Sequence, residues 1–259
     1  MNTISKLLKL KKERNAIILA HYYQDPEIQD IADFMGDSLA LAQHAQQTKA
    51  DVILFCGVHF MSETAKILNP SKTVIIPDMD AGCSLADSAA STEFKSWVQQ
   101  HSDHTLVSYI NCSAEVKAMS DIICTSSNAE KVINSIPLDQ PILFAPDQFL
   151  GKYLIKKTGR ELVLWPGFCQ VHVLFSLKEL IKLKIRYPKA KVIAHPECEE
   201  KILNHADFIG STTGLIKYTE AKQENQFIVI TEPGVIHQMK KLNPHKEYIP
   251  LANNEGCAC

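Results

Sequence analysis

Residues 74–83 read VIIPDMDAGC: a short apolar run, a proline that ends it, and a loop that delivers one cysteine. The same pattern returns at residues 162–169, LVLWPGFC, and at residues 248–257, YIPLANNEGC. The cysteines of the three stretches, Cys83, Cys169 and Cys257, are 86 and 88 residues apart. Self-similarity at a nearly fixed interval indicates a repeated architecture. The sequence therefore predicts a chain built three times over, with one thiol in each copy.

Short apolar runs alternate with helical stretches throughout each copy. The first runs of the copies are residues 16–20, 105–110 and 191–195. Such alternation with short connections predicts parallel sheets that helices cover on both faces. We expect an α/β protein of three homologous three-layer αβα repeats, residues 1–87, 88–173 and 174–259. Because each copy is small for an autonomous domain, we expect the copies to pack around a pseudo-threefold axis, with the third closing on the first.

The sequence makes two specific helix predictions, each just after the first strand of a copy. In the first copy, Asp25 and Pro26 predict a helix that runs through Phe34, with Asp25 as its N-cap. In the third copy, the pattern predicts a helix over residues 197–205. Both assignments rest on local sequence alone.

The composition is that of an ordinary globular protein, with 259 residues, 46% of them hydrophobic and 22% charged. The formal net charge of −2 provides no basic field for nucleic acid or an anionic membrane. No apolar run approaches the ~20 residues of a membrane helix, and the opening residues lack the apolar core of a signal peptide. We expect a cytoplasmic protein, or one of an organelle stroma, without nucleic-acid or membrane partners.

Polar side chains recur where the strands of each copy end. Three stand at the end of the first strand: His21, Tyr109 and His195. Three stand two residues further on, Tyr23, Asn111 and Glu197, and three at the second strand-to-helix turn, Ser38, Ser126 and Thr212. Ligands of open α/β sheets bind beyond the carboxyl ends of the strands. We therefore expect these groups and the three cysteines to face one central cavity.

Each of these positions also has a purely structural explanation. The hydroxyl residues are typical helix N-caps, although a capped helix N-terminus also offers N–H groups to a phosphate or carboxylate. His21 and His195 are either general acid–base groups or hydrogen-bonded residues at strand ends. His172, three residues after Cys169, either lines the same cavity or packs beside it.

The eight cysteines divide into groups with different expected roles. Four lie in or beside apolar segments and are expected to be small buried hydrophobes: Cys56, Cys112, Cys124 and Cys198. The three repeat cysteines fit a zinc site completed by one histidine or water, or a [4Fe–4S] cluster with one iron open to substrate. The remaining alternative is that they are relics of duplication without a ligand role.

Four segments resemble the quinolinate synthase family: residues 20–24 AHYYQ, 31–38 IADFMGDS, 57–68 GVHFMSETAKIL and 195–198 HPEC. The resemblance implies condensation of iminoaspartate with dihydroxyacetone phosphate to quinolinate, phosphate and water in NAD biosynthesis. It also implies a pseudo-threefold α/β fold with a [4Fe–4S] cluster on three cysteines. A functional link to the enzyme that supplies iminoaspartate follows as an expectation.

The family motifs carry over to individual residues. Cys83 and Cys169 match the first two cluster ligands. The substrate-contacting positions match His21, Tyr23, Ser38, Tyr109, Asn111, Ser126, His195, Glu197 and Thr212. Of these, the resemblance points to His21, Tyr23, Tyr109, His195 and Glu197 as catalytic. The sequence departs from the family pattern at its end, so that the third ligand is Cys257, Cys259 or a residue beyond this chain.

A mechanism follows from these assignments as a hypothesis. The open iron acts as a Lewis acid, helix N-termini at Ser126 and Thr212 hold the phosphate or dicarboxylate, and His195 with Glu197 moves protons. Two other functions fit the same residues: a small-molecule sensor based on an iron–sulfur cluster or zinc, and a zinc-dependent lyase or hydrolase.

Overall fold

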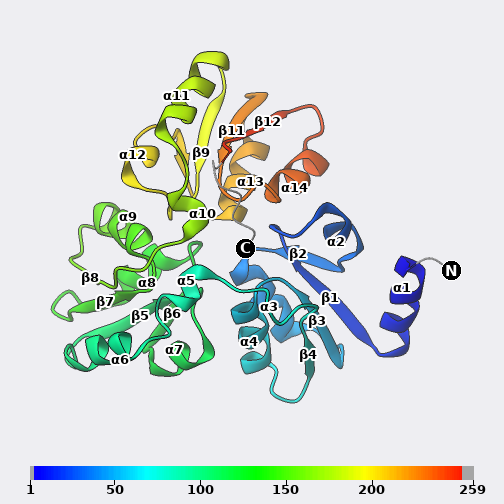
Figure 1. Ribbon diagram of the computed structural model, residues 1–259, viewed down its shortest axis with the longest axis horizontal. Coiled ribbons are helices and arrows are strands. Elements are labelled where there is room, and N and C mark those ends of the chain that lie inside the picture. Colours follow the sequence, from blue (N-terminus) through cyan, green and yellow to red (C-terminus); the bar gives the residue numbers. More distant parts are fainter. Residues whose placement is uncertain (1–2, 253–259) are drawn as a thin grey trace. The chain divides into compact units, whose positions relative to one another are not determined.

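The computed structural model describes residues 3–252. Contacts divide the chain into two compact units, the first ending at Cys83 and the second beginning at Ser84. The first unit holds one parallel four-stranded sheet and the second holds two (Figure 1). The α/β class with parallel sheets, predicted from the alternation of apolar runs and helices, is confirmed.

The sheet of the first unit has the strand order β2-β1-β3-β4. Its strands are β1 (Ala16–His21), β2 (Phe34–Gly36), β3 (Val52–Cys56) and β4 (Thr73–Ile75). The helices of this unit are α1 (Thr3–Glu13), α2 (Pro26–Ile31), α3 (Ser38–Gln47) and α4 (His59–Leu68). Helices α3 and α4 pack against each other beside the sheet.

The second unit begins with a sheet of order β6-β5-β7-β8. Its strands are β5 (Thr105–Tyr109), β6 (Ile122–Cys124), β7 (Ile142–Ala145) and β8 (Val163–Leu164). The accompanying helices are α5 (Ser84–Asp87), α6 (Thr92–Gln99), α7 (Ala114–Met119), α8 (Ala129–Ser135) and α9 (Gln148–Thr158).

The other sheet of the second unit has the order β10-β9-β11-β12. Its strands are β9 (Lys191–Ala194), β10 (Phe208–Ile209), β11 (Gln226–Ile230) and β12 (Glu247–Pro250). The accompanying helices are α10 (Gln170–Val173), α11 (Leu177–Arg186), α12 (Glu200–Leu203), α13 (Thr212–Ala221) and α14 (Val235–Leu242).

All three sheets share one topology. The first strand of each lies between the second and the third, so the strand order reverses at β1, β5 and β9. In open α/β sheets, ligands bind at the carboxyl ends of the strands beside such a reversal. The topology therefore draws attention to the residues that follow β1, β5 and β9.

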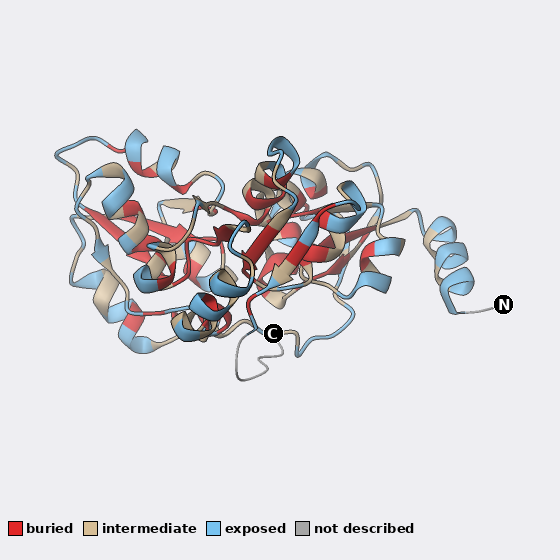
Figure 2. Cartoon of the chain, turned by 90° about the horizontal axis from the view of Figure 1, so that it is seen from above, coloured by how far each residue is buried: buried red, intermediate tan, exposed pale blue. Residues whose placement is uncertain are grey.

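The central strands form the cores of the sheets. All four residues of β7 are buried, as are the last four of β11. Figure 2 shows buried strand segments in red inside the molecule, while large parts of the helices are pale blue. Each fully buried Ile, Val, Leu or Phe contributes about 1.5–3 kcal/mol to folding. The strand ends are thus held on rigid, well-packed elements.

One aspartate in each copy clamps the first strand to the segment entering the second. The aspartates are Asp33, Asp121 and Asp207, 88 and 86 residues apart. A carboxylate oxygen of each accepts the backbone N–H of a first-strand residue at 2.8 Å. The N–H of each aspartate donates to the carbonyl of the same strand residue at 2.8–3.0 Å. The strand partners are Ile18, Leu106 and Val192.

A basic side chain binds carbonyl groups at or just beyond the end of a helix in each copy. The three residues are Lys72, Arg160 and Lys246, again 88 and 86 residues apart. The ammonium group of Lys246 donates to the carbonyls of Thr219 and Lys222 at the end of α13, and that of Lys72 donates to the Thr48 carbonyl after α3. The Arg160 guanidinium donates to the Ile136 carbonyl at 2.7 Å, after α8. A cation there complements the partial negative charge of a helix C-terminus.

The helix predicted from Pro26 through Phe34 is wrong in its second half. Helix α2 ends at Ile31, and the next residues form β2, in which Phe34 pairs with Leu19 of β1. Ladder hydrogen bonds to β1 override the local helical pattern. Asp25 occupies the N-cap position of α2 but makes no capping hydrogen bond with its side chain.

The helix predicted over residues 197–205 is shorter than expected. Only α12 is helical there, because the chain first makes a turn in which the Cys198 N–H donates to the His195 carbonyl at 3.1 Å. That turn buries Glu197, with 2% of its surface exposed, where a regular helix was expected.

Among the described residues, the helices include none that is long and apolar enough to cross a membrane. The repeat boundaries after residues 87 and 173 and the pseudo-threefold axis stay predictions. The repeated sheet order and the repeated clamps nevertheless support a chain built from three copies.

Candidate active site

The candidate site lies in the second unit, at the carboxyl ends of β5 and β9. Tyr109 is the last residue of β5, and His195 and Glu197 follow the end of β9. All three side chains are buried, with 5%, 2% and 2% of their surfaces exposed. Three polar residues predicted from the repeat thus stand where the topology favours ligand binding.

Glu197 joins the two sheets through one of its oxygens. The Tyr109 hydroxyl donates to Glu197 Oε1 at 2.6 Å. His195 Nδ1 lies 3.6 Å from the same oxygen, and the Glu197 N–H donates to that ring nitrogen at 3.5 Å. Hydrogen bonds to a carboxylate are shorter and stronger than neutral ones. The orientation of Glu197 is therefore fixed by residues of both sheets.

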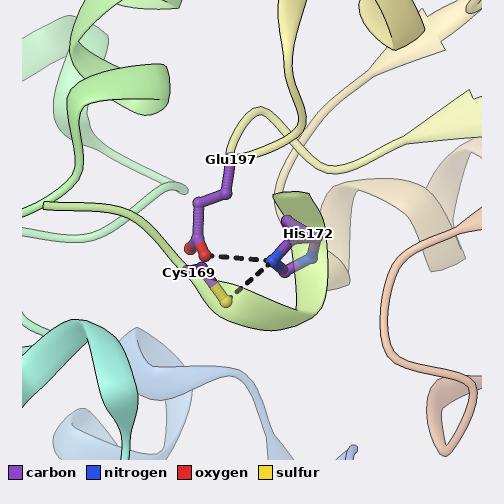
Figure 3. A group of neighbouring side chains, drawn as sticks. All are labelled: Cys169, His172 and Glu197. Carbon is purple, nitrogen blue, oxygen red and sulfur yellow. Dashed lines mark hydrogen bonds and ion pairs between the residues drawn. The ribbon is translucent and has the colours of Figure 1, made fainter. Parts of the chain in front are cut away.

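His172 contacts the other oxygen of Glu197. Its Nδ1 lies 3.1 Å from Glu197 Oε2 and 3.2 Å from Cys169 Sγ. Its Nε2 lies 3.0 Å from the hydroxyl of Thr231, the residue after β11. Figure 3 shows the side chains of Cys169, His172 and Glu197 pointing toward one another. Two alternatives were open for His172, and the structure places its ring among the polar side chains of Cys169, Glu197 and Thr231.

His195 connects this cluster to a further hydroxyl group. The imidazole rings of His195 and His172 stack, with centroids 4.8 Å apart and an interplanar angle of 25°. His195 Nε2 lies 3.3 Å from the hydroxyl oxygen of Ser126, in the turn after β6. The arrangement therefore gathers residues at or just after the carboxyl ends of β5, β6, β9 and β11, together with His172 of α10 and Cys169, which directly precedes α10.

The electrostatics keep Glu197 ionised. Burial raises the pKa of Glu197, but the charges of His195 and His172 and hydrogen bonds from His172 and Tyr109 outweigh burial and hold it well below the usual range. Asp147 shows the opposite behaviour, because burial and the charge of Glu197 raise its pKa well above the usual value. Carboxyl groups whose pKa values are pushed apart are typical of acid–base sites.

Asp147 also holds the loop that carries Cys169. Its Oδ2 accepts the Cys169 N–H at 3.2 Å, and its Oδ1 accepts the Leu150 N–H at 2.7 Å and so caps α9. The Gln148 N–H donates to the Gly167 carbonyl at 2.9 Å. Asp147 was not predicted from the sequence, although an acidic residue directly before a helix is a recognisable N-cap signal.

Two other predicted residues of the second unit lie in different surroundings. Asn111 Oδ1 is buried and makes no hydrogen bond within the described part of the chain. Thr212 is the first residue of α13, which is capped by Ser211 through the Gly214 N–H at 3.2 Å. The Ser127 hydroxyl donates to that of Ser211 at 2.9 Å and links the two turns. A buried acceptor such as Asn111 Oδ1 suits a donor on a ligand.

The first unit repeats part of this geometry. His21 is the last residue of β1, and its Nδ1 accepts the N–H of Tyr23 at 3.3 Å, as in the third copy. The two rings meet edge to face, with centroids 4.4 Å apart. Ser38 is the first residue of α3, and Cys83, the last residue of the unit, carries a partly buried thiol.

Comparison with known proteins adds a decisive observation. A family model described as quinolinate synthetase A protein matches residues 5–259. The chain is 61% identical to a quinolinate synthase of Synechocystis sp. over 256 residues, which are 99% of this chain and 80% of that protein. It is 61% identical over 99% of its length to one of Cyanophora paradoxa, and 60% identical over its full length to one of Nostoc sp.. These matches cover 78% and 80% of the two relatives.

The chain belongs to the quinolinate synthetase A family. The resemblance stated from four short motifs is thereby confirmed across nearly the whole chain. The repeat periodicity of the sequence predicted four residues that the structure brings together: Tyr109, Ser126, His195 and Glu197. Periodicity missed Thr231 and Asp147, whose positions are not matched by polar residues of the same kind in the other copies.

The N-cap explanation does not fit the repeated hydroxyl residues of this family member. Ser38 and Thr212 are first helical residues, and the caps are Asp37 and Ser211. Ser126 lies before α8, whose N-cap position is Asn128. The structural role proposed for these three positions is therefore wrong, because each cap lies elsewhere.

The cysteines separate as expected in the part that the structure describes. The four predicted core thiols are all buried: Cys56, Cys112, Cys124 and Cys198. Cys83 and Cys169 are only partly buried. Cys257 and Cys259 lie outside the described residues. Two thiols accessible to a metal or cluster thus remain among the described residues, one in each unit.

Proposed function

We propose that this chain is a quinolinate synthase that condenses iminoaspartate with dihydroxyacetone phosphate to quinolinate, phosphate and water. Family membership supports the activity, and the observation that carries the mechanism is the buried, ionised Glu197 between two histidines and a tyrosine. Its product would enter NAD biosynthesis, and an enzyme that releases iminoaspartate is its functional partner.

Glu197 is the general base of this proposal. An ionised carboxylate that Tyr109 and His172 hold by hydrogen bonds can accept a proton from substrate and return it without moving. Tyr109 and His195 each approach Glu197 Oε1 within 3.6 Å and can relay that proton. Ring closure and dehydration both require proton transfer between carbon, nitrogen and oxygen atoms, which this chain of groups provides.

Substrate binding draws on the remaining strand-end residues. Asn111 Oδ1, buried without a partner among the described residues, offers an acceptor to a substrate N–H or O–H group. The N-terminus of α13 at Thr212 and the Ser126 turn offer donors to phosphate or carboxylate groups. In the first unit, the family motifs support His21 and Tyr23 as catalytic residues and Ser38 as a substrate ligand.

The cofactor of the proposal is a [4Fe–4S] cluster. Cys83 and Cys169 fit such a group because both thiols are partly exposed, whereas the core thiols are buried. The third ligand is Cys257, Cys259 or a residue beyond this chain. When bound by three cysteines, the cluster supplies a Lewis-acidic iron. Asp147 fixes the backbone of Cys169, and His172 hydrogen-bonds its sulfur.

The alternative functions receive no comparable support. The family match favours the synthase over a metal-based sensor and over a zinc-dependent lyase or hydrolase. The deciding experiment is anaerobic purification and cluster reconstitution, with iron, sulfide and zinc analysis and a quinolinate assay. A brown protein that forms quinolinate from both substrates is expected. A colourless zinc protein, or a brown one that forms no quinolinate, contradicts the proposal.

A further inference from the structure

Three different donor atoms converge beside the proposed cluster ligand. Cys169 Sγ, His172 Nδ1 and a carboxylate oxygen of Glu197 all lie within 4.8 Å of one another (Figure 3). His172 Nδ1 lies 3.2 Å from the sulfur and 3.1 Å from the oxygen. Zinc bonds of 2.0–2.3 Å in tetrahedral geometry separate ligand atoms by roughly 3.3–3.8 Å. The three atoms therefore need only small shifts to share one ion.

The surroundings of the three donors also match those of a metal site. Ligating histidines bond their second nitrogen to another group, and ligating carboxylates are themselves hydrogen-bonded. Here His172 Nε2 lies 3.0 Å from the Thr231 hydroxyl, and the second oxygen of Glu197 accepts the Tyr109 hydroxyl at 2.6 Å. A hydroxyl can donate or accept, so Thr231 satisfies Nε2 whether or not Nδ1 binds a metal.

Charge favours a divalent cation at this position. A Cys169 thiolate and the Glu197 carboxylate together carry two negative charges. Glu197 and the neighbouring His172 are buried, with 2% and 3% of their surfaces exposed, and Cys169 is partly buried. Buried charges are stable only when they are paired. A single Zn²⁺ balances both, and a thiolate, an imidazole and a carboxylate are all zinc ligands. Three protein ligands leave the fourth position to water.

We propose that the cluster-free protein binds one Zn²⁺ through Cys169, His172 and Glu197, and that this ion competes with cluster assembly for Cys169. The zinc site rests on the described geometry alone, whereas the competition rests on the proposed function, in which Cys169 is a cluster ligand. This site differs from a zinc site on the three repeat cysteines, because two of its three ligands are not cysteines.

The test begins with protein freed of iron and zinc by chelation under anaerobic conditions. Co²⁺ serves as the spectroscopic substitute for Zn²⁺, because a thiolate-to-cobalt charge-transfer band reports the Cys169 bond. Zinc affinity is then measured by competition with a chelating dye. The wild type is expected to bind one ion with the thiolate band. His172→Gln should lose the band and bind zinc more than about a hundredfold more weakly, since outer partners alone change affinity 10–100-fold.

Three further variants make the result specific. Cys83→Ser should retain the cobalt band while losing the iron–sulfur cluster. His245→Gln, an exposed histidine, is the matched control and should behave as the wild type. Thr231→Val removes only an outer partner and should weaken zinc binding by roughly 10–100-fold. It therefore keeps the site testable if His172→Gln fails to fold, as judged by circular dichroism.

Competition is measured by cluster reconstitution with one equivalent of zinc. Bound iron should fall in the wild type and stay unchanged in His172→Gln. A cobalt band that survives in His172→Gln but vanishes in Cys83→Ser would overturn the inference, because zinc would then occupy the repeat cysteines. Failure to form quinolinate with intact zinc binding at the three residues would reject the proposed function and leave the zinc site standing.

Discussion

Tyr109 and Glu197 are 88 residues apart in the sequence, yet the tyrosine hydroxyl donates to the carboxylate at 2.6 Å. The contact joins the end of β5 to the turn after β9, and so connects two copies of the repeat within the second unit. Tyr109 matches His195 of the third copy and Glu197 matches Asn111 of the second, so strand-end residues two repeat positions apart have become partners. A chain built from duplicated units can assemble a catalytic group in this way, because equivalent strand ends face one another.

Glu197→Gln tests the proton-transfer role most directly. The amide cannot accept a proton, although it retains the size of the side chain. We expect kcat to fall by about 10²–10⁴-fold, the usual contribution of general acid–base catalysis, with the iron content unchanged. Quinolinate formation and iron analysis on the same anaerobic preparation provide the measurement. An unchanged kcat with an intact cluster would exclude Glu197 as the base.

Tyr109→Phe should act through Glu197. The variant removes the 2.6 Å hydrogen bond and leaves the ring in place. Because residues of one hydrogen-bonded group are not additive, the double variant Tyr109→Phe/Glu197→Gln should lose little more activity than Glu197→Gln alone. Tyr187→Phe, a tyrosine at the end of α11, is the control and should be as active as the wild type. Multiplicative losses in the double variant would show that the tyrosine acts independently.

The sequence predicted the architecture well wherever periodicity carries the information. Strand ends, sheet class and the core cysteines followed from runs of apolar residues and from the repeat interval. Strand β2 was missed because only three residues form it, and its pairing with β1 is a contact between separate segments. Local sequence cannot report such pairing.

The candidate site was predicted in part for a related reason. His195 and Glu197 were found because they recur at strand ends, but His172 was left undecided and Thr231 was not considered. The 3.0 Å contact between these two residues joins positions 59 apart in the chain. Nothing in the repeat pattern places them together, so only the folded structure shows that both nitrogens of His172 have partners.

The described cysteines should differ sharply in alkylation. Burial raises the pKa of Cys56 to about 11 and raises those of Cys124 and Cys198 still further above the usual value. Because only the thiolate reacts, these thiols should resist iodoacetamide at neutral pH, whereas Cys83 and Cys169 should react in the cluster-free protein. Peptide mass spectrometry after native labelling, with the unfolded protein as control, measures the difference.

The raised pKa of Cys56 also predicts how the free energy of unfolding depends on pH. In the unfolded chain the Cys56 thiol ionises near pH 9, while in the folded protein it ionises near 11. Its contribution is fully present below pH 9 and is lost as the pH rises towards 11. Cys56→Ala should flatten this alkaline decline in the free energy of unfolding; an identical decline in both proteins would contradict the shift.

The aspartate clamp of the second copy should contribute measurably to stability. Asp121 accepts the Leu106 N–H at 2.8 Å, and Asp121→Ala leaves that donor without its carboxylate partner. Hydrogen bonds to charged groups contribute about 1.5–3 kcal/mol. We expect the free energy of unfolding in urea to fall by that amount. Asp139→Ala, at an exposed position, should change it by less than about 0.5 kcal/mol. Equal effects of the two variants would mean that the clamp has no special role.

Gly167→Ala tests whether the loop before Cys169 tolerates any side chain. A methyl group there would lie 2.3 Å from Ser88 Oγ and 2.5 Å from the Pro146 carbonyl oxygen, and the backbone atom cannot easily move away. Overpacking of this kind costs about 1–3 kcal/mol. The loop should also shift, so that Cys169 reacts faster with iodoacetamide in the cluster-free protein. Gly82→Ala is the matched control beside the other partly exposed cysteine, because among the described residues its methyl group would meet only the Asp80 carbonyl oxygen, at 3.7 Å. We expect Gly82→Ala to leave the free energy of unfolding and the reactivity of the Cys169 thiol unchanged. A Gly167→Ala protein as stable as this control would show that the loop is not tightly packed.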